Sequence, residues 1–242
     1  MSSFKFEFNW KITLFSVLLL PLLISLGFWQ LSRAQQKETL QQSWLEEQAL
    51  PPVHYRELLD RENASGARRV FAEGSFDTQK YWLVENKILA GKLGYHLVAP
   101  FYTEYQDWLL VNLGWVPADA YREVNPEVII PAGKLRISGT LRTPSDSRFI
   151  EQKPDNSGEW PFRLLEIDFP LMNDQYGKPF ETRVIFADAD SPGAQLVSWQ
   201  PINMTPERHR GYALQWFAMA FALLVLWFVT NTNVLKGLTS ED

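Results

Sequence analysis

His209 is the residue whose position in the sequence most favours a binding role. If the segment around it is helical, His209, Tyr212 and Trp216 lie on one face, at spacings of three and four residues. A neutral imidazole can bind the iron of a porphyrin axially, and aromatic side chains can cover the macrocycle. The alternative is that Arg208, His209 and Arg210 are interfacial cations that contact lipid headgroups, while Trp216 packs inside a membrane. Taken alone, these residues favour the second interpretation.

A second group of residues would meet this imidazole if the two ends of the chain form a helical hairpin. Trp29, Gln30 and Arg33 stand at the end of an apolar run near the N-terminus, and Gln30, Arg33 and Lys37 share one helix face. Arginine side chains at this interface can pair bidentately with propionate groups. Gln215, one turn inside the second apolar run, is expected to form an interhelical hydrogen bond or to line the same pocket.

The rest of the sequence offers few candidates for chemistry. There are no cysteines, three histidines and four methionines, which excludes thiolate nucleophiles and makes a copper or zinc site poor in ligands. We expect His54 and His96 to be surface or satisfied core histidines. No G-x-S-x-G, H-E-x-x-H or phosphate-loop pattern occurs, so a membrane-anchored hydrolase has no motif to support it. The net charge of -5 argues against a nucleic-acid partner.

Two uncharged apolar runs are predicted to position the candidate residues. Residues 12–31 carry no charge and form about 30 Å of helix, which is enough to cross a hydrocarbon core. The second uncharged run covers residues 211–235. We expect the first run to be a retained anchor, because it is longer than the apolar part of a typical signal peptide and lacks a small-residue cleavage site.

The predicted topology has both termini in the cytoplasm and the long loop outside it. Long loops translocate largely regardless of charge, and the first helix usually sets the orientation. The chain begins about ten residues before the first run without an Arg- and Ser-rich leader, which favours a bacterial inner membrane and a multi-pass protein. The predicted segments are a cytoplasmic tail (1–11), a transmembrane helix (12–31), an extracytoplasmic domain (32–207), a second transmembrane helix with its entry (208–230) and a cytoplasmic tail (231–242).

The loop is predicted to be mostly β-structure after a helical entry over residues 32–49, which Pro51 and Pro52 end. Beyond it the apolar period changes to two, as in strands. A short helix is expected around residues 162–172. The expected strands are 69–76, 81–86, 95–101, 108–112, 135–141, 183–186 and 195–199. Short strands joined by turns predict an antiparallel barrel or sandwich, and the fold class is a membrane α+β protein.

Four blocks of sequence, in this order along the chain, resemble one known family. They are Leu26–Arg33 followed by Lys37, Glu73–Phe76, Val111–Pro117, and the set His209, Tyr212, Ala213, Trp216 and Phe217. Framed by two terminal apolar runs, they resemble the surfeit locus protein one family, the membrane assembly factors of cytochrome c oxidase. The chain departs from the common pattern at Leu113, Arg208 and Gln215, where Arg, Asn and Thr are common, so an Arg role at position 113 does not transfer.

The resemblance implies an accessory protein and not an enzyme. Family members help to mature the catalytic subunit of haem-copper oxidases, and bacterial members are linked to haem a. The implied partners are that subunit, other assembly factors and membrane lipid. Carried over by residue, His209 is the candidate haem ligand beside Tyr212 and Trp216, and Trp29, Gln30 and Arg33 line the opposite wall. The alternative is a scaffold that holds nascent oxidase subunits and does not bind haem.

Overall fold

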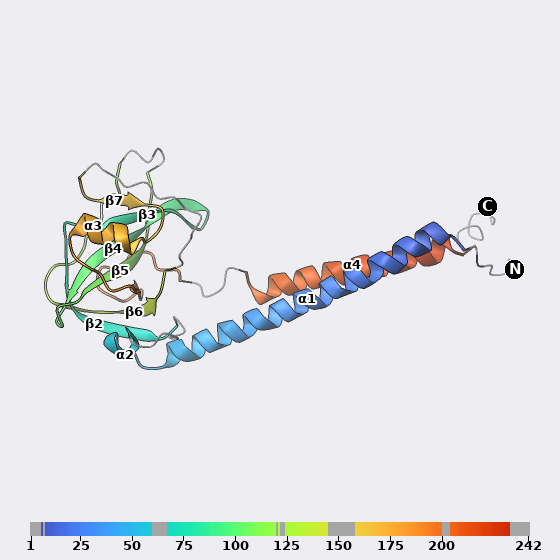
Figure 1. The fold of residues 1–242 in the computed structure, drawn as a ribbon, viewed down its shortest axis with the longest axis horizontal. Helices are drawn as coiled ribbons and strands as arrows, with labels where there is room; N and C mark the ends of the chain where they lie inside the picture. The colour runs from blue at the N-terminus through green and yellow to red at the C-terminus, as the bar shows by residue number, and fades with distance from the viewer. Residues whose placement is uncertain are drawn as a thin grey trace. The chain divides into compact units, whose positions relative to one another are not determined.

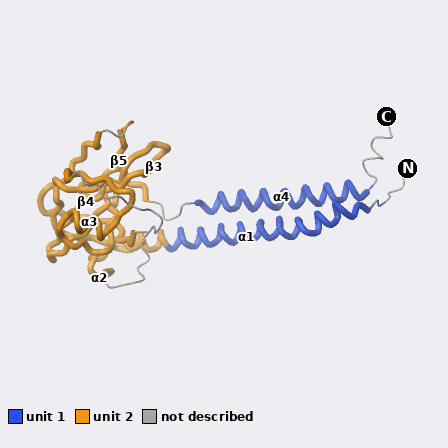
Figure 2. Tube along the Cα trace, turned by 45° about the horizontal axis from the view of Figure 1, so that its top comes forward, with its two compact units in different colours: residues 1–43, 202–242 blue, residues 44–201 orange. Residues whose placement is uncertain are grey.

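The computed structural model divides the chain into two compact units, residues 1–43 with 202–242 and residues 44–201 (Figure 2). The residues that it describes are 6, 8–59, 67–119, 121, 124–144, 158–199 and 204–232. Most of the predicted tails, 1–11 and 231–242, lies outside them.

The first unit is a pair of helices that lie side by side (Figure 1). Helix α1 covers Trp10–Ala49 and α4 covers Pro206–Thr230. In the described part of the chain these are the two helices long and apolar enough to cross a membrane. α1 continues without a break through Pro21 and through the predicted helical entry to Ala49. The polar extension of the first helix, expected from the spacing of its apolar residues, is therefore confirmed.

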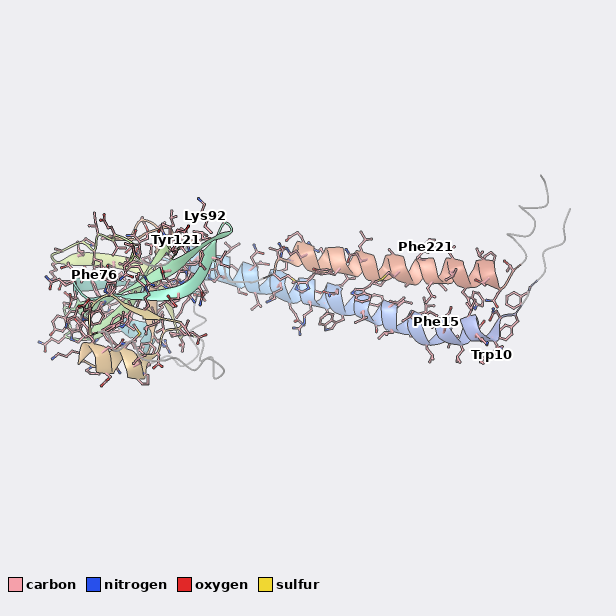
Figure 3. All side chains as sticks on the ribbon, turned by 90° about the horizontal axis from the view of Figure 1, so that it is seen from above. Trp10, Phe15, Phe76, Lys92, Tyr121 and Phe221 are labelled. Atoms are coloured by element: carbon pink, nitrogen blue, oxygen red, sulfur yellow. The ribbon has the colours of Figure 1, made fainter. Side chains whose placement is uncertain are left out.

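The two helices pack along a seam of residues spaced by three, four and seven positions. The buried residues are Ser16, Leu23, Gly27 and Ala34 on α1 and Pro206, His209, Ala213, Ala220 and Leu223 on α4. This spacing is that of helices whose side chains interdigitate at a shallow crossing angle. The side chains that point away from the seam are largely apolar and exposed, Trp10, Phe15 and Phe221 among them (Figure 3).

Polar contacts hold the two chain ends of this helix pair together. The amide oxygen of the fully buried Asn231 accepts a hydrogen bond from the backbone N–H of Asn9 at 2.7 Å. The indole N–H of Trp227 donates to the hydroxyl of Thr13 at 3.1 Å. The start of α1 therefore lies beside the end of α4, so the helices are antiparallel.

The second unit is built around a closed five-stranded β-barrel. The bounds of the strands are β1 (Val53–His54), β2 (Arg69–Phe76), β3 (Trp82–Leu89), β4 (Lys92–Thr103), β5 (Trp108–Pro117), β6 (Leu135–Arg142), β7 (Phe162–Leu164) and β8 (Val184–Ala187). The barrel strands, in sheet order, are β2, β6, β8, β5 and β4, and β1, β3 and β7 extend the sheet. The sheet order is β1-β2-β6-β8-β5-β4-β3-β7, and an additional pairing of β2 with β4 closes the barrel. The sequence left barrel and sandwich open, and the structure has the barrel.

The sheet is mixed, whereas the sequence predicted an antiparallel one. β1 pairs with β2, β3 with β7 and β5 with β8 in parallel. A parallel pair needs a long connection that returns the chain to the same end of the sheet. The connection from Pro117 to Val184 is long enough to do this. The expectation failed because strand direction depends on these connections and not on the alternation within a strand.

Two predicted elements differ from the structure. The short helix expected around 162–172 is present but lies further along the chain, as α3 (Phe169–Tyr176), and β7 takes the start of the expected range. α3 begins where the Asp168 carboxylate accepts the N–H of Leu171 at 3.1 Å, and it ends at Gly177 with a φ of 78°. The apolar residues of this segment fit both periods, and pairing with β3 selects a strand.

The strand expected over 195–199 is reduced to one bridge between Leu196 and Trp115. β5 is already paired with β8 through Asn112. Only its last residues are therefore free to bind the segment.

The barrel interior and its covered outer face form two hydrophobic cores. The inner core includes Val70, Ala72, Leu97, Val111, Ile137 and Ile185. The outer core, which includes Trp82, Val98, Leu110, Met172, Phe180 and Val184, packs under α3. β5 is buried on both faces over most of its length, which explains why its sequence is apolar almost without alternation.

Candidate functional site in the helix pair

The predicted meeting of the two terminal segments is present in the structure at Gln30 and His209. Nδ1 of His209 lies 2.7 Å from Oε1 of Gln30, and the His209 side chain is only 9% exposed. His209 stands in the first turn of α4, which begins at Pro206. Gln30 stands on the seam of α1, seven residues beyond Leu23. The contact joins residues 179 positions apart in sequence.

Aromatic and glycine packing lies next to this contact. The ring of Phe217 packs edge-on against Phe28, with centroids 5.4 Å apart, and covers Gly27. A Cβ at Gly27 would lie 2.5 Å from the ring, so only glycine lets the two helices approach this closely here. Neither Gly27 nor Phe28 was among the predicted site residues. Both residues lie in the Leu26–Arg33 block. The signal that could have found them is the glycine itself, because its missing side chain leaves room for the Phe217 ring of the other helix.

The predicted aromatic residues have different environments. Trp216 is half-buried and packs in the hydrophobic seam with Leu23, Ala220 and Leu223. Tyr212 and Trp29 remain 44% and 50% exposed.

The guanidinium carbon of Arg33 lies 5.6 Å from the centre of the Trp29 ring, so these two side chains cover each other on the surface of α1. Gln215 is exposed. Within the described residues Gln215 makes no interhelical hydrogen bond, so the first of its two expected roles is wrong.

The cations of this region are divided between paired and exposed groups. Nη2 of Arg210 lies 2.8 Å from both carboxylate oxygens of Glu38, in a salt bridge that joins α4 to α1. Arg33 donates to Gln36 on its own helix at 3.0 Å and is exposed, as is Arg208. Arg33 and Arg208 are thus the arginines of this region that remain accessible to an anionic group from outside.

The donor set around His209 fits an iron porphyrin better than a bare metal ion. The described residues contain no group of three or more His, Cys, Asp or Glu side chains that could hold a metal. A metal at His209 must therefore bring most of its own ligands, as a porphyrin does. Exposed aromatic faces at Trp29 and Tyr212 and the guanidinium of Arg33 supply the apolar and cationic surfaces that such a group needs.

The other two histidines lie in the barrel unit. His96 on β4 faces Asn112, with Nδ1 3.3 Å from the amide nitrogen, and packs edge-on against Trp199. Burial, and then the charge of Lys87, lowers the pKa of His96 to about 4. His54 on β1 packs against aromatic rings, Phe71 and Tyr105 among them. His96 is therefore a satisfied core histidine, as expected.

Comparison with known proteins identifies the family. A model of the SURF1 family matches residues 17–221, which include most of both helices and the whole barrel unit. The chain belongs to the SURF1 family. This family is one of cytochrome c oxidase assembly factors, and the role implied by the four sequence blocks is confirmed at this level.

Two SURF1 relatives show how far the similarity extends. The chain is 26% identical to a SURF1-like protein of Rickettsia felis over 236 residues, which cover 93% of this chain and 99% of the relative. It is 27% identical to surfeit locus protein 1 of Mus musculus over 230 residues, which cover 84% of this chain and 70% of the relative. The similarity to the Rickettsia protein thus covers the helix pair and the barrel together.

Proposed function

We propose that this SURF1 family member is a two-span membrane protein that holds haem a at His209 for insertion into the catalytic subunit of cytochrome c oxidase. The observation that carries this proposal is the buried imidazole of His209 in contact with Gln30, at the place where α1 and α4 become polar. The chain that makes this contact belongs to the SURF1 family of oxidase assembly factors.

The membrane part of the proposal rests on the exposed surface of the helix pair. Leucine and phenylalanine side chains on both helices are more than half exposed, including Leu14, Leu18, Phe28, Leu214, Phe221 and Leu226. A soluble protein rarely exposes so continuous an apolar surface, whereas lipid covers it without cost. This surface supports a membrane position for both helices. The proposal adds the placement expected from the sequence, a bacterial inner membrane with the barrel unit on the extracytoplasmic side.

In this proposal His209 would hold the iron of the haem. One ring nitrogen of a neutral imidazole is unprotonated and can coordinate iron. Tyr212 and Trp29 offer exposed aromatic surface to the macrocycle, and the guanidinium groups of Arg33 and Arg208 can pair with its propionates. Bound haem supplies the iron centre that gives the protein its colour. The barrel unit then docks the oxidase subunit.

Spectroscopy on the full chain tests this function. The protein is expressed together with the enzymes of haem a synthesis and purified in detergent. We expect a Soret band that His209→Ala abolishes or shifts, with the haem affinity lowered at least about tenfold. His54→Ala, on the barrel, is the matched control and should retain the band. A colourless wild-type protein, or a His209→Ala variant with an unchanged spectrum, contradicts the proposal.

A scaffold that never binds haem is the second candidate. It is favoured by the low exposure of His209 and by the salt bridge of Arg210 with Glu38, because both contacts can serve helix association alone. This candidate predicts that His209→Ala still co-purifies with the oxidase subunit and that the membranes contain as much assembled oxidase as wild type. The haem proposal predicts assembled subunit with less haem a.

A further inference from the structure

The side-chain amide of Gln30 presents its oxygen to the ring of His209. An amide oxygen can only accept a hydrogen bond. At 2.7 Å from Gln30 Oε1, Nδ1 of His209 must therefore carry the proton. In a neutral imidazole the other nitrogen, Nε2, then keeps its lone pair. In the part of the chain that the structure describes, the side-chain hydrogen bond of His209 is the one at Nδ1, and none is formed at Nε2.

We propose that Gln30 is a positioning residue that holds His209 as the Nδ1–H tautomer and so makes Nε2 the coordinating nitrogen. This inference rests on the proposed function. Histidines that bind metals commonly donate their second N–H to a neighbouring acceptor, which orients the ring and selects the nitrogen that binds. Gln30 stands in that relation to His209 from the opposite helix.

The packing around the pair fixes the position of the amide. Gln30 follows Ser16 and Leu23 at intervals of seven residues on α1, and His209 precedes Trp216 and Leu223 at the same interval on α4. The pair is thus a polar layer in an otherwise largely apolar seam. A polar layer at a seam position sets the register of two helices.

Two further contacts, one on each side of this layer, hold the register. On one side, Arg210 pairs with Glu38 through two 2.8 Å contacts. On the other side, Phe217 covers Gly27 and packs against Phe28. Neither helix can slide along the other without losing one of these contacts, so the Gln30 oxygen is held opposite Nδ1.

The neutral amide of Gln30 also affects how tightly the His209 imidazole binds iron. A carboxylate acceptor would raise the basicity of the imidazole and tighten iron binding. An amide orients the ring without adding charge, so it does not tighten iron binding. This suits a protein that must release haem to another subunit. Gln30→Glu is therefore expected to keep the tautomer and to bind haem more tightly than wild type.

Nitrogen NMR tests the tautomer without any cofactor. The full chain is labelled with 15N-histidine in detergent micelles, and His209→Ala assigns the signal. We expect a protonated Nδ1 and an unprotonated, downfield-shifted Nε2 in the wild type. Gln30→Met removes the acceptor while preserving the length of the side chain, and should shift the ring toward the Nε2–H form. Gln215→Met, the same change at an exposed position of α4, is the control and should leave the spectrum unchanged.

Titration with ferric haem b then tests coordination. We expect Gln30→Met to weaken binding about 10- to 100-fold, Gln30→Glu to restore or exceed wild-type affinity, and Gln215→Met to have no effect. If Gln30→Met fails to fold, Gln30→Glu still tests the inference. It should keep the Nδ1–H tautomer and bind haem at least as tightly as the wild type.

The outcomes separate this inference from the proposed function. An Nε2–H ring in the wild type, or a tautomer that Gln30→Met leaves unchanged, overturns the inference even if His209 binds haem. The predicted tautomers without haem binding in any variant support the role of Gln30 in orienting the ring, and overturn both the coordinating role of Nε2 and the proposed function.

Discussion

Neighbouring amides hold two histidines of this protein in opposite tautomers. Oδ1 of Asn112 accepts the N–H of Gly114 at 3.1 Å, so its amide nitrogen faces Nδ1 of His96 and the ring accepts there. Oε1 of Gln30 faces Nδ1 of His209, so that ring donates. Which atom of the amide faces the ring decides which nitrogen keeps a lone pair. For His96 the lone pair at Nδ1 is used inside the protein, whereas among the described residues none donates to the lone pair of His209 at Nε2.

The lowered pKa of His96 predicts an acid-dependent loss of stability. The folded state keeps the ring neutral down to about pH 4, because burial, and then the charge of Lys87, disfavours the imidazolium form. The unfolded chain takes up a proton near the ordinary value of 6.5. This contribution is therefore fully present above pH 6.5 and is lost as the pH falls to about 4, by up to about 3 kcal/mol.

The measurement is urea unfolding of the full chain in detergent, followed by near-UV circular dichroism at pH 7 and pH 4.5. His96→Gln cannot titrate, so its stability should fall less between the two pH values than that of the wild type. Carboxylates contribute equally to both proteins and cancel in the difference. Equal losses in the two proteins would show that His96 is not the group responsible.

The buried hydrogen bonds of Tyr55 predict a second effect on stability. Tyr55 lies at the junction of β1 and α2 (Arg56–Leu59). This fully buried side chain donates from its hydroxyl to Asp107 at 2.6 Å and lies 3.1 Å from the hydroxyl of Thr103. Burial, and then the bond to Asp107, raises its pKa to about 12. Tyr55→Phe should destabilise the barrel unit by about 1–3 kcal/mol, because Asp107 and Thr103 lose a buried partner. Thermal unfolding against a Tyr121→Phe control, at an exposed position, measures the loss, and equal melting temperatures would contradict it.

At the scale of elements, glycine decides how closely α1 and α4 approach. Gly27→Val should separate the helices, since a Cβ would lie 2.5 Å from the Phe217 ring and the ring would have to move. We expect overpacking to lower the free energy of unfolding by about 1–3 kcal/mol. The contact between Gln30 and His209 should also weaken. Gly211→Ala is the control, because a Cβ there meets nothing within 4 Å. It should be neutral or stabilising by about 1 kcal/mol.

Thermal unfolding in detergent measures both glycine variants, and the nitrogen NMR signal of His209 reports on the contact directly. A Gly27→Val variant with wild-type stability and an unchanged His209 signal would mean that the helix pair tolerates the added volume. The close approach would then have no energetic role.

The elements that could be predicted from sequence are those whose pattern is local. The strands at 69–76 and 135–141 were found because their alternation reflects one face against the barrel interior. β7 was missed because three residues are too few to show a period, and because they form a strand only by pairing with β3. The parallel pairing of β5 with β8 was missed for the same kind of reason, since it depends on a distant segment.

At the scale of the whole molecule, the absence of cysteine from the sequence makes the topology directly testable. Thr78→Cys places one thiol at an exposed position of the barrel unit, and Lys11→Cys places one at the start of α1. In spheroplasts, a membrane-impermeant maleimide should label Thr78→Cys and not Lys11→Cys. Permeabilised cells should label both. Labelling of Lys11→Cys alone in spheroplasts would reverse the topology, and labelling of both would argue against an N-terminal end in the cytoplasm.

The two apolar helices, most of the strands and the family of this protein could be predicted from its amino-acid sequence. These features depend on hydropathy, on short-range periodicity and on blocks of residues that are contiguous in the chain. The closure of the barrel by β2 against β4, the pairing of Arg210 with Glu38 and the contact of Gln30 with His209 became visible in the folded chain. Each of these joins elements that are separate in the chain. The register between such elements is set by packing along whole faces, and no local pattern contains it.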